Sequence, residues 1–188
     1  MSLPFGAHLA EHRALFAQLD ALAGDVQRAA DCIRDALRNG GKVMFCGNGG
    51  SAADSQHLAS EFTGRFVDDR RPLAALALST DSSALTCIAN DYSFDQVFER
   101  QLRGLGRNGD VLVAISTSGR SPNVQRAAVA ARELGIAVIG LLGRDGGSLK
   151  ALSDVALVVP SQSTARIQEA HIFIGHTLCA LVEATLEP

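Results

Sequence analysis

The sequence predicts an α/β protein: a doubly wound, five-stranded parallel sheet of flavodoxin-like type with flanking helices. Two observations predict it. Five short apolar runs are continuous rather than alternating, as expected of strands that are buried on both faces. Helical segments separate these runs, and such strand–helix alternation is typical of a parallel sheet with right-handed crossovers. An N-terminal helical segment precedes the sheet, and a C-terminal helix follows it.

The elements follow in order along the chain. Residues 5–38 contain no proline and carry apolar side chains at helical spacing, so we expect two helices divided near Gly24, with Asp25 capping the second. The predicted strands are residues 43–46, 73–78, 111–115, 136–142 and 155–159. The predicted helices after them are residues 51–66, 82–103, 121–134, 147–152 and 164–186.

Length and composition limit the class of protein. The chain has 188 residues, which predicts one domain over 1–188, made of a helical segment (1–40) and an α/β core (41–188). Hydrophobic residues make up 47% and charged residues 20%, which excludes a disordered or collagen-like chain. The formal net charge is -3 and no run of Lys and Arg occurs, so nucleic acid is not an expected partner.

The cellular compartment follows from what the sequence lacks. The N-terminus has neither the basic start nor the apolar core of a signal peptide, and no apolar run approaches the ~18 residues of a membrane span. We therefore expect a soluble cytoplasmic protein with no membrane partner. The cysteines are far apart and form no Cys-x-x-Cys pair, so we expect small buried residues in a reducing compartment at Cys32, Cys46, Cys87 and Cys179.

The last predicted helix is almost uniformly apolar. Between residues 170 and 182 only His171, His176 and Thr177 are polar. A terminal helix of a small monomer normally keeps one solvated face. We infer a homo-oligomer with this helix at an interface, and a central helix of a monomer is the alternative.

Two loops that follow predicted strands have the composition of an anion site. Gly47-Asn48-Gly49-Gly50-Ser51 follows the first strand, and Ser116-Thr117-Ser118-Gly119-Arg120-Ser121 follows the third. Glycines let the backbone approach a ligand, hydroxyls bind phosphate oxygens, and helix starts attract anions. In a parallel sheet both loops lie at the carboxyl edge, where ligands bind. Each alone also fits a tight turn without a ligand, but two on one edge indicate a phosphate cradle.

Two predicted helices carry side chains that can do chemistry. His57 and Glu61 are spaced i, i+4 and share one helix face, which is a metal-binding or acid–base spacing and also a common surface pair. Gln168, His171 and His176 lie in the apolar last helix, where polar groups need partners.

Five motifs and one histidine carry a resemblance to a known family. They are Gly-Asn-Gly-Gly-Ser at 47–51, Gln-His-x-x-x-Glu at 56–61, Ala-Asn-Asp at 89–91, Ser-Thr-Ser-Gly-x-Ser at 116–121 and Arg-Ile-Gln-Glu-x-His at 166–171, followed by His176. With them the chain resembles the sugar isomerase (SIS) domain family over nearly its whole length. One departure is Ala165, where some members carry Asp, and it concerns one substrate contact.

The resemblance implies an SIS-type fold and a specific activity. It implies an intramolecular oxidoreductase, an aldose–ketose isomerase that converts D-sedoheptulose 7-phosphate to D-glycero-D-manno-heptose 7-phosphate by enediol proton transfer. That reaction is the first step of nucleotide-activated heptose biosynthesis, which supplies lipopolysaccharide and related glycans. The resemblance further implies a cytoplasmic homotetramer.

The resemblance also implies which residues act. It implies one zinc ion per subunit, held by His57, Glu61, Gln168 and His176, with Glu61 and His176 as the catalytic acid–base pair. It implies a substrate-binding set at Asn48, Gly49, Gly50, Ser51, Glu61, Asn90, Asp91, Ser116, Thr117, Ser118, Ser121 and Gln168.

Two functions without turnover are the alternatives. One relative in the same family is a non-catalytic protein that binds the bacterial replication initiator, and other SIS domains are sugar-phosphate sensors fused to a DNA-binding segment. The resemblance implies that the initiator-binding subgroup lacks the catalytic Glu and the final His, whereas this chain has Glu61 and His176. No DNA-binding segment is visible. The sequence therefore favours the enzyme.

The spacing of two implied metal ligands restricts how the site is assembled. Gln168 and His176 are eight residues apart, so on a regular helix their Cα atoms are separated by about 12 Å along the axis and about 80° around it. One ion is difficult to reach from both. We therefore expect either an irregular helix around Gly175 or, as the favoured alternative, a site shared between subunits that combines Glu61 of one chain with His176 of another.

Overall fold

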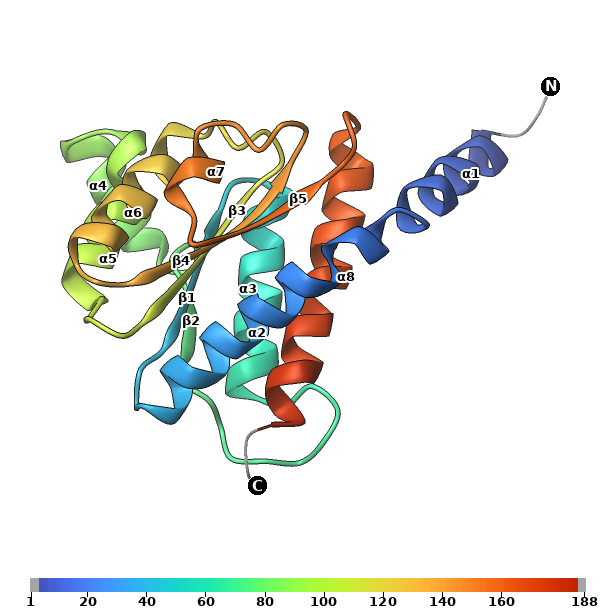
Figure 1. Cartoon of the computed structure of the whole chain (residues 1–188). Helices are drawn as coiled ribbons and strands as arrows, with labels where there is room; N and C mark the ends of the chain where they lie inside the picture. Colours follow the sequence, from blue (N-terminus) through green and yellow to red (C-terminus); the bar gives the residue numbers. More distant parts are fainter. Residues whose placement is uncertain (1–3, 186–188) are drawn as a thin grey trace.

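The centre of the molecule is a five-stranded parallel sheet with the order β2-β1-β3-β4-β5 (Figure 1). It is seen in a computed structural model that describes residues 4–185. The strands are β1 (Val43–Gly47), β2 (Ala75–Ala77), β3 (Val111–Ser116), β4 (Ala137–Gly143) and β5 (Val155–Val159). The predicted α/β class and parallel sheet are confirmed.

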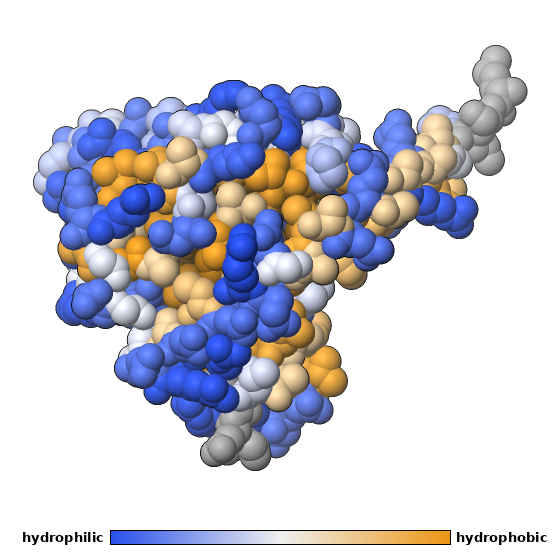
Figure 2. Space-filling view, in the orientation of Figure 1, coloured by the Kyte–Doolittle hydropathy of each residue, from blue (hydrophilic) through white to orange (hydrophobic). Residues whose placement is uncertain are grey.

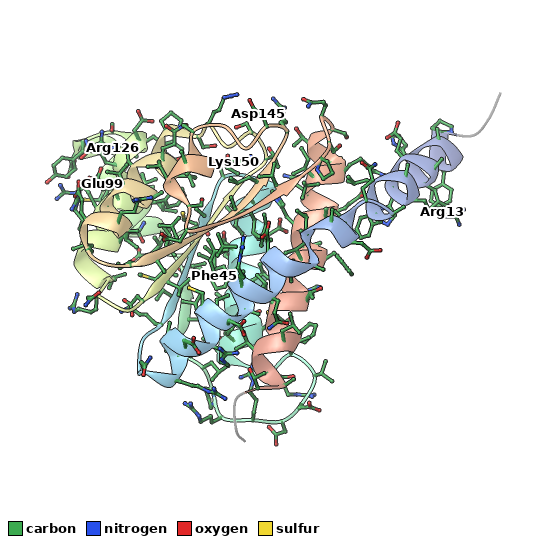
Figure 3. The ribbon with its side chains drawn as sticks, viewed as in Figure 1. Arg13, Phe45, Glu99, Arg126, Asp145 and Lys150 are labelled. Atoms are coloured by element: carbon green, nitrogen blue, oxygen red, sulfur yellow. The ribbon has the colours of Figure 1, made fainter. Side chains whose placement is uncertain are left out.

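Helices cover both faces of the sheet. They are α1 (Pro4–Phe16), α2 (Ala23–Arg38), α3 (Gly50–Thr63), α4 (Ser82–Asp91), α5 (Val97–Leu105), α6 (Pro122–Glu133), α7 (Leu149–Leu152) and α8 (Thr164–Glu183), with short 3-10 helices η1 (Leu19–Leu22) and η2 (Phe94–Gln96). Phe45 of β1 points into a core formed with α2, α3 and α8 (Figure 3). Its neighbour Met44 belongs to a core on the other face, formed with α5 and α6.

The crossovers change face between β1 and β3. These strands are hydrogen-bonded neighbours, with Gly47 opposite Ile115, but α3 follows β1 on one face and α6 follows β3 on the other. The chain therefore leaves the two strand ends in opposite directions. In open α/β sheets this switch point opens the crevice that binds ligands, beyond the carboxyl ends of the strands.

Several predicted boundaries are wrong. The N-terminal helices are divided at η1, which brings Leu19 into the core beside Leu15, rather than at Gly24. Asp25 lies inside the first turn of α2 and pairs with Arg28 instead of capping the helix. The predicted helix 82–103 is divided into α4, η2 and α5, and the strand 73–78 is only three residues long. The last helix ends at Glu183, and residue 186 lies outside the described residues.

Helix α1 projects from the body of the molecule (Figure 1). Leu15 is its one buried residue and Phe5 is 75% exposed. Its contacts are with α8, where His12 Nδ1 lies 2.8 Å from Glu169 Oε2, and Figure 2 shows apolar residues along its length. A projecting helix with apolar surface fits the proposed oligomer, because a neighbouring chain would cover it.

Hydropathy and cysteine placement complete the description. None of the described helices is both long and apolar enough to cross a membrane. All four cysteines are free; Cys46 and Cys179 are buried and Cys32 is half-buried. Cys87 is exposed on α4, so the expectation of a buried residue is wrong there.

Candidate active site

The first loop forms the start of α3. Gly49 has φ 57°, a left-handed conformation that favours glycine, and it precedes the first helical residue. Ser51 is buried, with its amide bonded to the carbonyl of Asn48 at 3.0 Å. A Cβ added to Gly50 would overlap the Gln168 amide, so Gln168 of α8 lies directly on the first turn of α3.

The second loop gathers hydroxyl groups at the start of α6. Ser116 Oγ and Ser121 Oγ are 3.1 Å apart, and Ser116 Oγ also accepts the N–H of Gly119 at 3.2 Å. Ser118 Oγ accepts the N–H of Arg120 at 3.2 Å. Hydroxyls gathered at a helix N-terminus form a phosphate site without a basic motif.

An asparagine that the sequence analysis missed joins the two loops. Asn123, 2% exposed in the first turn of α6, exchanges two side-chain hydrogen bonds of 2.9 Å with Asn48. This reciprocal amide pair fixes the two loops relative to each other. No motif identifies it, and only its place two residues after Ser121 could have drawn attention to it.

The loop after β4 packs against the second loop, residues 116–121, which we call the hydroxyl loop. A Cβ added to Gly119 would overlap the backbone of Gly146, so the two loops touch backbone to backbone. The amide of Leu149 donates to the Gly119 carbonyl at 3.1 Å, and Arg120 pairs with Asp145. Figure 3 shows Asp145 on the edge of the molecule that carries these loops. The hydroxyl loop is thus tied to the loop after β4 by backbone and side-chain contacts.

Three ionisable side chains converge where α3 lies beside α8. His57 Nε2 is 2.9 Å from His176 Nε2 and 3.4 Å from Glu61 Oε1. One donor atom from each residue lies within 4.8 Å of the other two. We call these three residues the acid–base cluster. It belongs to a single chain, so the expectation that Glu61 and His176 meet only between subunits is wrong.

Helix α8 is continuous through the cluster. It runs from Thr164 to Glu183 without interruption, so the alternative of an irregular helix is also wrong. Gly175 has no room for a Cβ because Leu58 of α3 packs against it. The two helices therefore run parallel and in close contact, with Gly50 beside Gln168 at one end and Leu58 beside Gly175 further along.

The cluster is suited to a divalent cation. Two imidazole nitrogens and a carboxylate oxygen pointing at one position are a donor set that suits zinc and other divalent ions. The pKa of His176 lies below its ordinary value because partial burial and then the neighbouring His57 disfavour the imidazolium, and Glu61 offsets only part of this. A neutral imidazole is the form that binds a metal.

Other predicted site residues lie away from the cluster. Gln168 lies against Gly50, two turns of α8 before His176. Within the described residues, the side-chain hydrogen bonds of Asn90 and Asp91 stay inside α4, on the opposite face of the sheet from α3 and α8. The structure therefore brings together His57, Glu61 and His176, and separately the two loops, but not Asn90 and Asp91.

The loops and the cluster lie at opposite ends of α3 within one chain. Ser51 and Glu61 are ten residues apart on this helix, which separates their Cα atoms by about 15 Å. An extended seven-carbon sugar phosphate spans about 10 Å from its first carbon to phosphorus, by ordinary bond lengths. From Cα to Cα, Ser51 and Glu61 of one chain are therefore farther apart than such a substrate is long.

Comparison with known proteins agrees with this architecture. A family model described as SIS domain matches residues 7–143. The phosphoheptose isomerase of Helicobacter hepaticus is 52% identical over 180 residues, covering 96% of this chain and 90% of that protein. The structure of the phosphoheptose isomerase from Neisseria gonorrhoeae matches with a TM-score of 0.92 at 49% identity, covering 96% of this chain and 97% of that chain.

A second solved structure gives the same result. The phosphoheptose isomerase from Francisella tularensis matches with a TM-score of 0.93 at 36% identity, covering 96% of this chain and 97% of that chain. The likeness thus extends over sequence and fold, and over nearly the full length of each protein. The chain belongs to the phosphoheptose isomerases of the SIS domain family.

Proposed function

We propose that the protein isomerises sedoheptulose 7-phosphate to the corresponding aldose, D-glycero-D-manno-heptose 7-phosphate. The observation that carries the proposal is the convergence of His57, Glu61 and His176 in a chain that is 52% identical to a phosphoheptose isomerase. A binder of the replication initiator or a sugar-phosphate sensor would need no acid–base pair, and Glu61 and His176 therefore favour turnover.

The reaction moves two protons and leaves the composition of the sugar unchanged. The Glu61 carboxylate takes a proton from C1 of the ketose and returns it to C2 after the enediol has formed. His176, whose pKa is lowered by burial so that the neutral imidazole is favoured, carries the hydroxyl proton between the oxygens of C1 and C2. The two residues together complete the aldose without any external oxidant or reductant.

The acid–base cluster is proposed to hold zinc. His57, Glu61 and His176 would supply three ligands, which leaves an open position for the substrate, as in catalytic zinc sites. Lewis-acid polarisation of the sugar oxygens is the chemistry that such an ion supplies when bound. Glu61 and His176 would then each have two tasks, binding the ion and moving a proton.

The complete site is proposed to form between two copies of the chain. The acid–base cluster of one chain would face the hydroxyl loop, the Asn48–Ser51 segment and Gln168 of another, because Ser51 and Glu61 of a single chain lie farther apart than such a substrate is long. The exposed Phe173 of α8 and the projecting α1, where Phe5 is exposed, would offer the surface for such an assembly (Figure 2). A tetramer is the proposed state, and Asn90 and Asp91 are retained as proposed substrate contacts.

The loops supply binding energy away from the reacting carbons. The hydroxyls of Ser116, Thr117, Ser118 and Ser121, gathered at the N-terminus of α6, would hold the phosphate. Holding the distant phosphate places C1 and C2 at the cluster and lowers the entropy cost of reaction.

The test is turnover of sedoheptulose 7-phosphate by purified protein, with and without a chelator, and by Glu61→Gln. Because Gln keeps the size of Glu but cannot accept a proton, we expect turnover to fall by about 10²–10⁴-fold with the fold retained. Chelation should also abolish turnover, and zinc should restore it.

The matched control is Glu133→Gln, which changes a glutamate that is 56% exposed and pairs with Arg103 far from the cluster. It should leave turnover unchanged. Near wild-type turnover by Glu61→Gln would remove Glu61 from the mechanism, and binding of the sugar phosphate without turnover by the wild type would favour a sensor.

A further inference from the structure

A buried ion pair lies where α3 ends and is not used in the mechanism above. The side chains of Arg70 and Glu183 are each only 5% exposed, and Arg70 Nε donates to Glu183 Oε2 at 2.8 Å. Arg70 belongs to the loop after α3, and Glu183 is the last residue of α8. The pair therefore links the two helices that carry the acid–base cluster.

Glu183 binds the backbone of the loop as well as the guanidinium. Its Oε1 accepts the N–H groups of Val67 and Asp68, both at 2.8 Å, and its Oε2 accepts the N–H of Phe66 at 3.1 Å. Three successive amides and a guanidinium fill the hydrogen-bonding capacity of one carboxylate. The loop is thus tied to the C-terminal end of α8.

Arg70 also binds the C-terminal end of α3. Its Nη2 donates to the carbonyl of Glu61 at 2.7 Å, and its Nη1 donates to those of Phe62 and Gly64 at 3.0 and 3.3 Å. Carbonyls at the end of a helix have no partner within the helix, and a cation there is favoured by the helix dipole. Arg70 therefore caps the turn of α3 that carries Glu61.

Phe66, a residue of the same loop, packs against the acid–base cluster. The Phe66 ring lies against the His176 ring, with centroids 5.3 Å apart and an interplanar angle of 31°. His176 and Glu183 are seven residues apart and share one face of α8. The same ion pair therefore holds the backbone of Glu61 at one end and the ring that packs on His176 at the other.

We propose that the Arg70–Glu183 pair positions the acid–base cluster: it fixes the end of α3 against α8 and so sets how Glu61 meets His176 and how tightly the cluster binds a divalent cation. Arg70, Glu183 and Phe66 are positioning residues, since none is a member of the cluster. The kinetic consequence rests on the proposed function, whereas the consequence for cation binding stands on the cluster itself.

The experiment titrates metal-free, full-length protein with Co²⁺ and follows its absorption spectrum. In Glu183→Gln and Arg70→Lys we expect Co²⁺ binding to weaken by about 10–100-fold, as when partners of metal ligands are removed. With zinc and sugar phosphate, kcat should fall while KM stays within about twofold, because neither variant changes the loops that would hold the phosphate.

The matched control is Asp110→Asn. Asp110 is also a buried carboxylate, 2% exposed, and it accepts the N–H groups of Lys42 and Arg107 at 3.0 and 2.7 Å and the Lys42 ammonium at 2.6 Å. It lies at the start of β3, at the opposite edge of the sheet from the loops. Asp110→Asn should lower thermal stability in the same way as Glu183→Gln but leave Co²⁺ binding within twofold of wild type.

Folded Glu183→Gln and Arg70→Lys proteins that bind Co²⁺ as tightly as Asp110→Asn would overturn the proposal. If neither variant folds, Phe66→Leu decides, since it removes the ring from His176 without exposing a buried charge. It should weaken Co²⁺ binding several-fold and change the absorption spectrum, and wild-type binding by this variant would also overturn the proposal. Absence of wild-type turnover would contradict the proposed isomerase instead, with the Co²⁺ comparison still intact.

Discussion

Gly50 shows how much depends on a single missing side chain. Its conformation is ordinary for a helix, so any residue could adopt it, but the space that a Cβ would need is filled by the amide of Gln168. Glycine is therefore needed at position 50 because the Gln168 side chain fills the space, and not because of the backbone conformation. This contact places Gln168 beside the loops instead of beside His176.

Gly50→Ala should displace Gln168 and leave the fold intact. Loss of one hydrogen bond to the bound sugar phosphate costs about 1 kcal/mol, so we expect affinity measured by calorimetry to fall several-fold or more. Gly104→Ala is the control, because nothing lies within 4 Å of a Cβ added there in α5. Equal affinities of the two variants would show that Gln168 does not contact the substrate.

Single residues were predictable from sequence where their chemistry is local. His57 and Glu61 share a helix face by spacing alone, and the hydroxyls at 116–121 follow one strand. The roles of Asn123 and Glu183 were not predictable, because each depends on a partner 75 or more residues away in the sequence. An amide in a first turn or a glutamate at a helix end has many ordinary explanations, and only the packing selects one.

At the scale of elements, α8 is held to the sheet by a buried histidine. His171 is fully buried, and its Nε2 lies 2.9 Å from the carbonyl oxygen of Leu142 at the end of β4. Its Nδ1 is buried without a hydrogen-bond partner among the described residues. Burial lowers the pKa of His171 to about 4, although the bond to Leu142 acts in the opposite direction.

This histidine should make the protein less stable in mild acid. The unfolded chain takes up a proton near pH 6.5 and the folded chain only near pH 4, so stability is lost as pH falls through this window. The loss is at most about 1.4 kcal/mol per pH unit. In His171→Gln, urea midpoints between pH 7 and 5 should depend less on pH.

The control for this prediction is His8→Gln, which changes a histidine whose side chain is 66% exposed on α1. Its stability should depend on pH as in the wild type. An unchanged pH dependence in folded His171→Gln would mean that His171 does not resist protonation, and another group would have to explain any acid sensitivity.

The elements themselves were predicted better than their ends. Continuous apolar runs identified all five strands because burial on both faces leaves a strong signal. The division of residues 82–103 was missed, since Tyr92 and Ser93 interrupt the helical pattern without a glycine or proline. The N-terminal helices are divided where Leu19 packs into the core. This is tertiary packing, which local helix propensity does not predict.

At the scale of the whole molecule, the proposed shared site predicts complementation between inactive variants. Glu61→Gln keeps an intact phosphate cradle, and Ser118→Ala combined with Ser121→Ala keeps an intact cluster. If each site draws its halves from two chains at random, an equal mixture should regain about a quarter of wild-type turnover after subunit exchange.

The control mixture is Glu61→Gln with His176→Gln. These residues meet within one chain, so no exchange can rebuild a cluster, and the mixture should stay inactive. Exchange itself is followed by native mass spectrometry of isotope-labelled chains. If the chains of the first mixture exchange completely and no turnover returns, the loops and the cluster that bind one substrate must belong to the same chain.

The contact between Gly119 and Gly146 limits how this protein can acquire new specificity. The touching atoms belong to the backbone, so no repacking of neighbouring side chains can make room for a larger residue at position 119. A library of variants selected for a different sugar phosphate should therefore recover glycine there. The neighbouring Arg120 and Asp145 are free to vary, because their side chains are 57% and 65% exposed. Position 119 is thus closed to substitution by its backbone neighbour, whereas the side chains around it can vary.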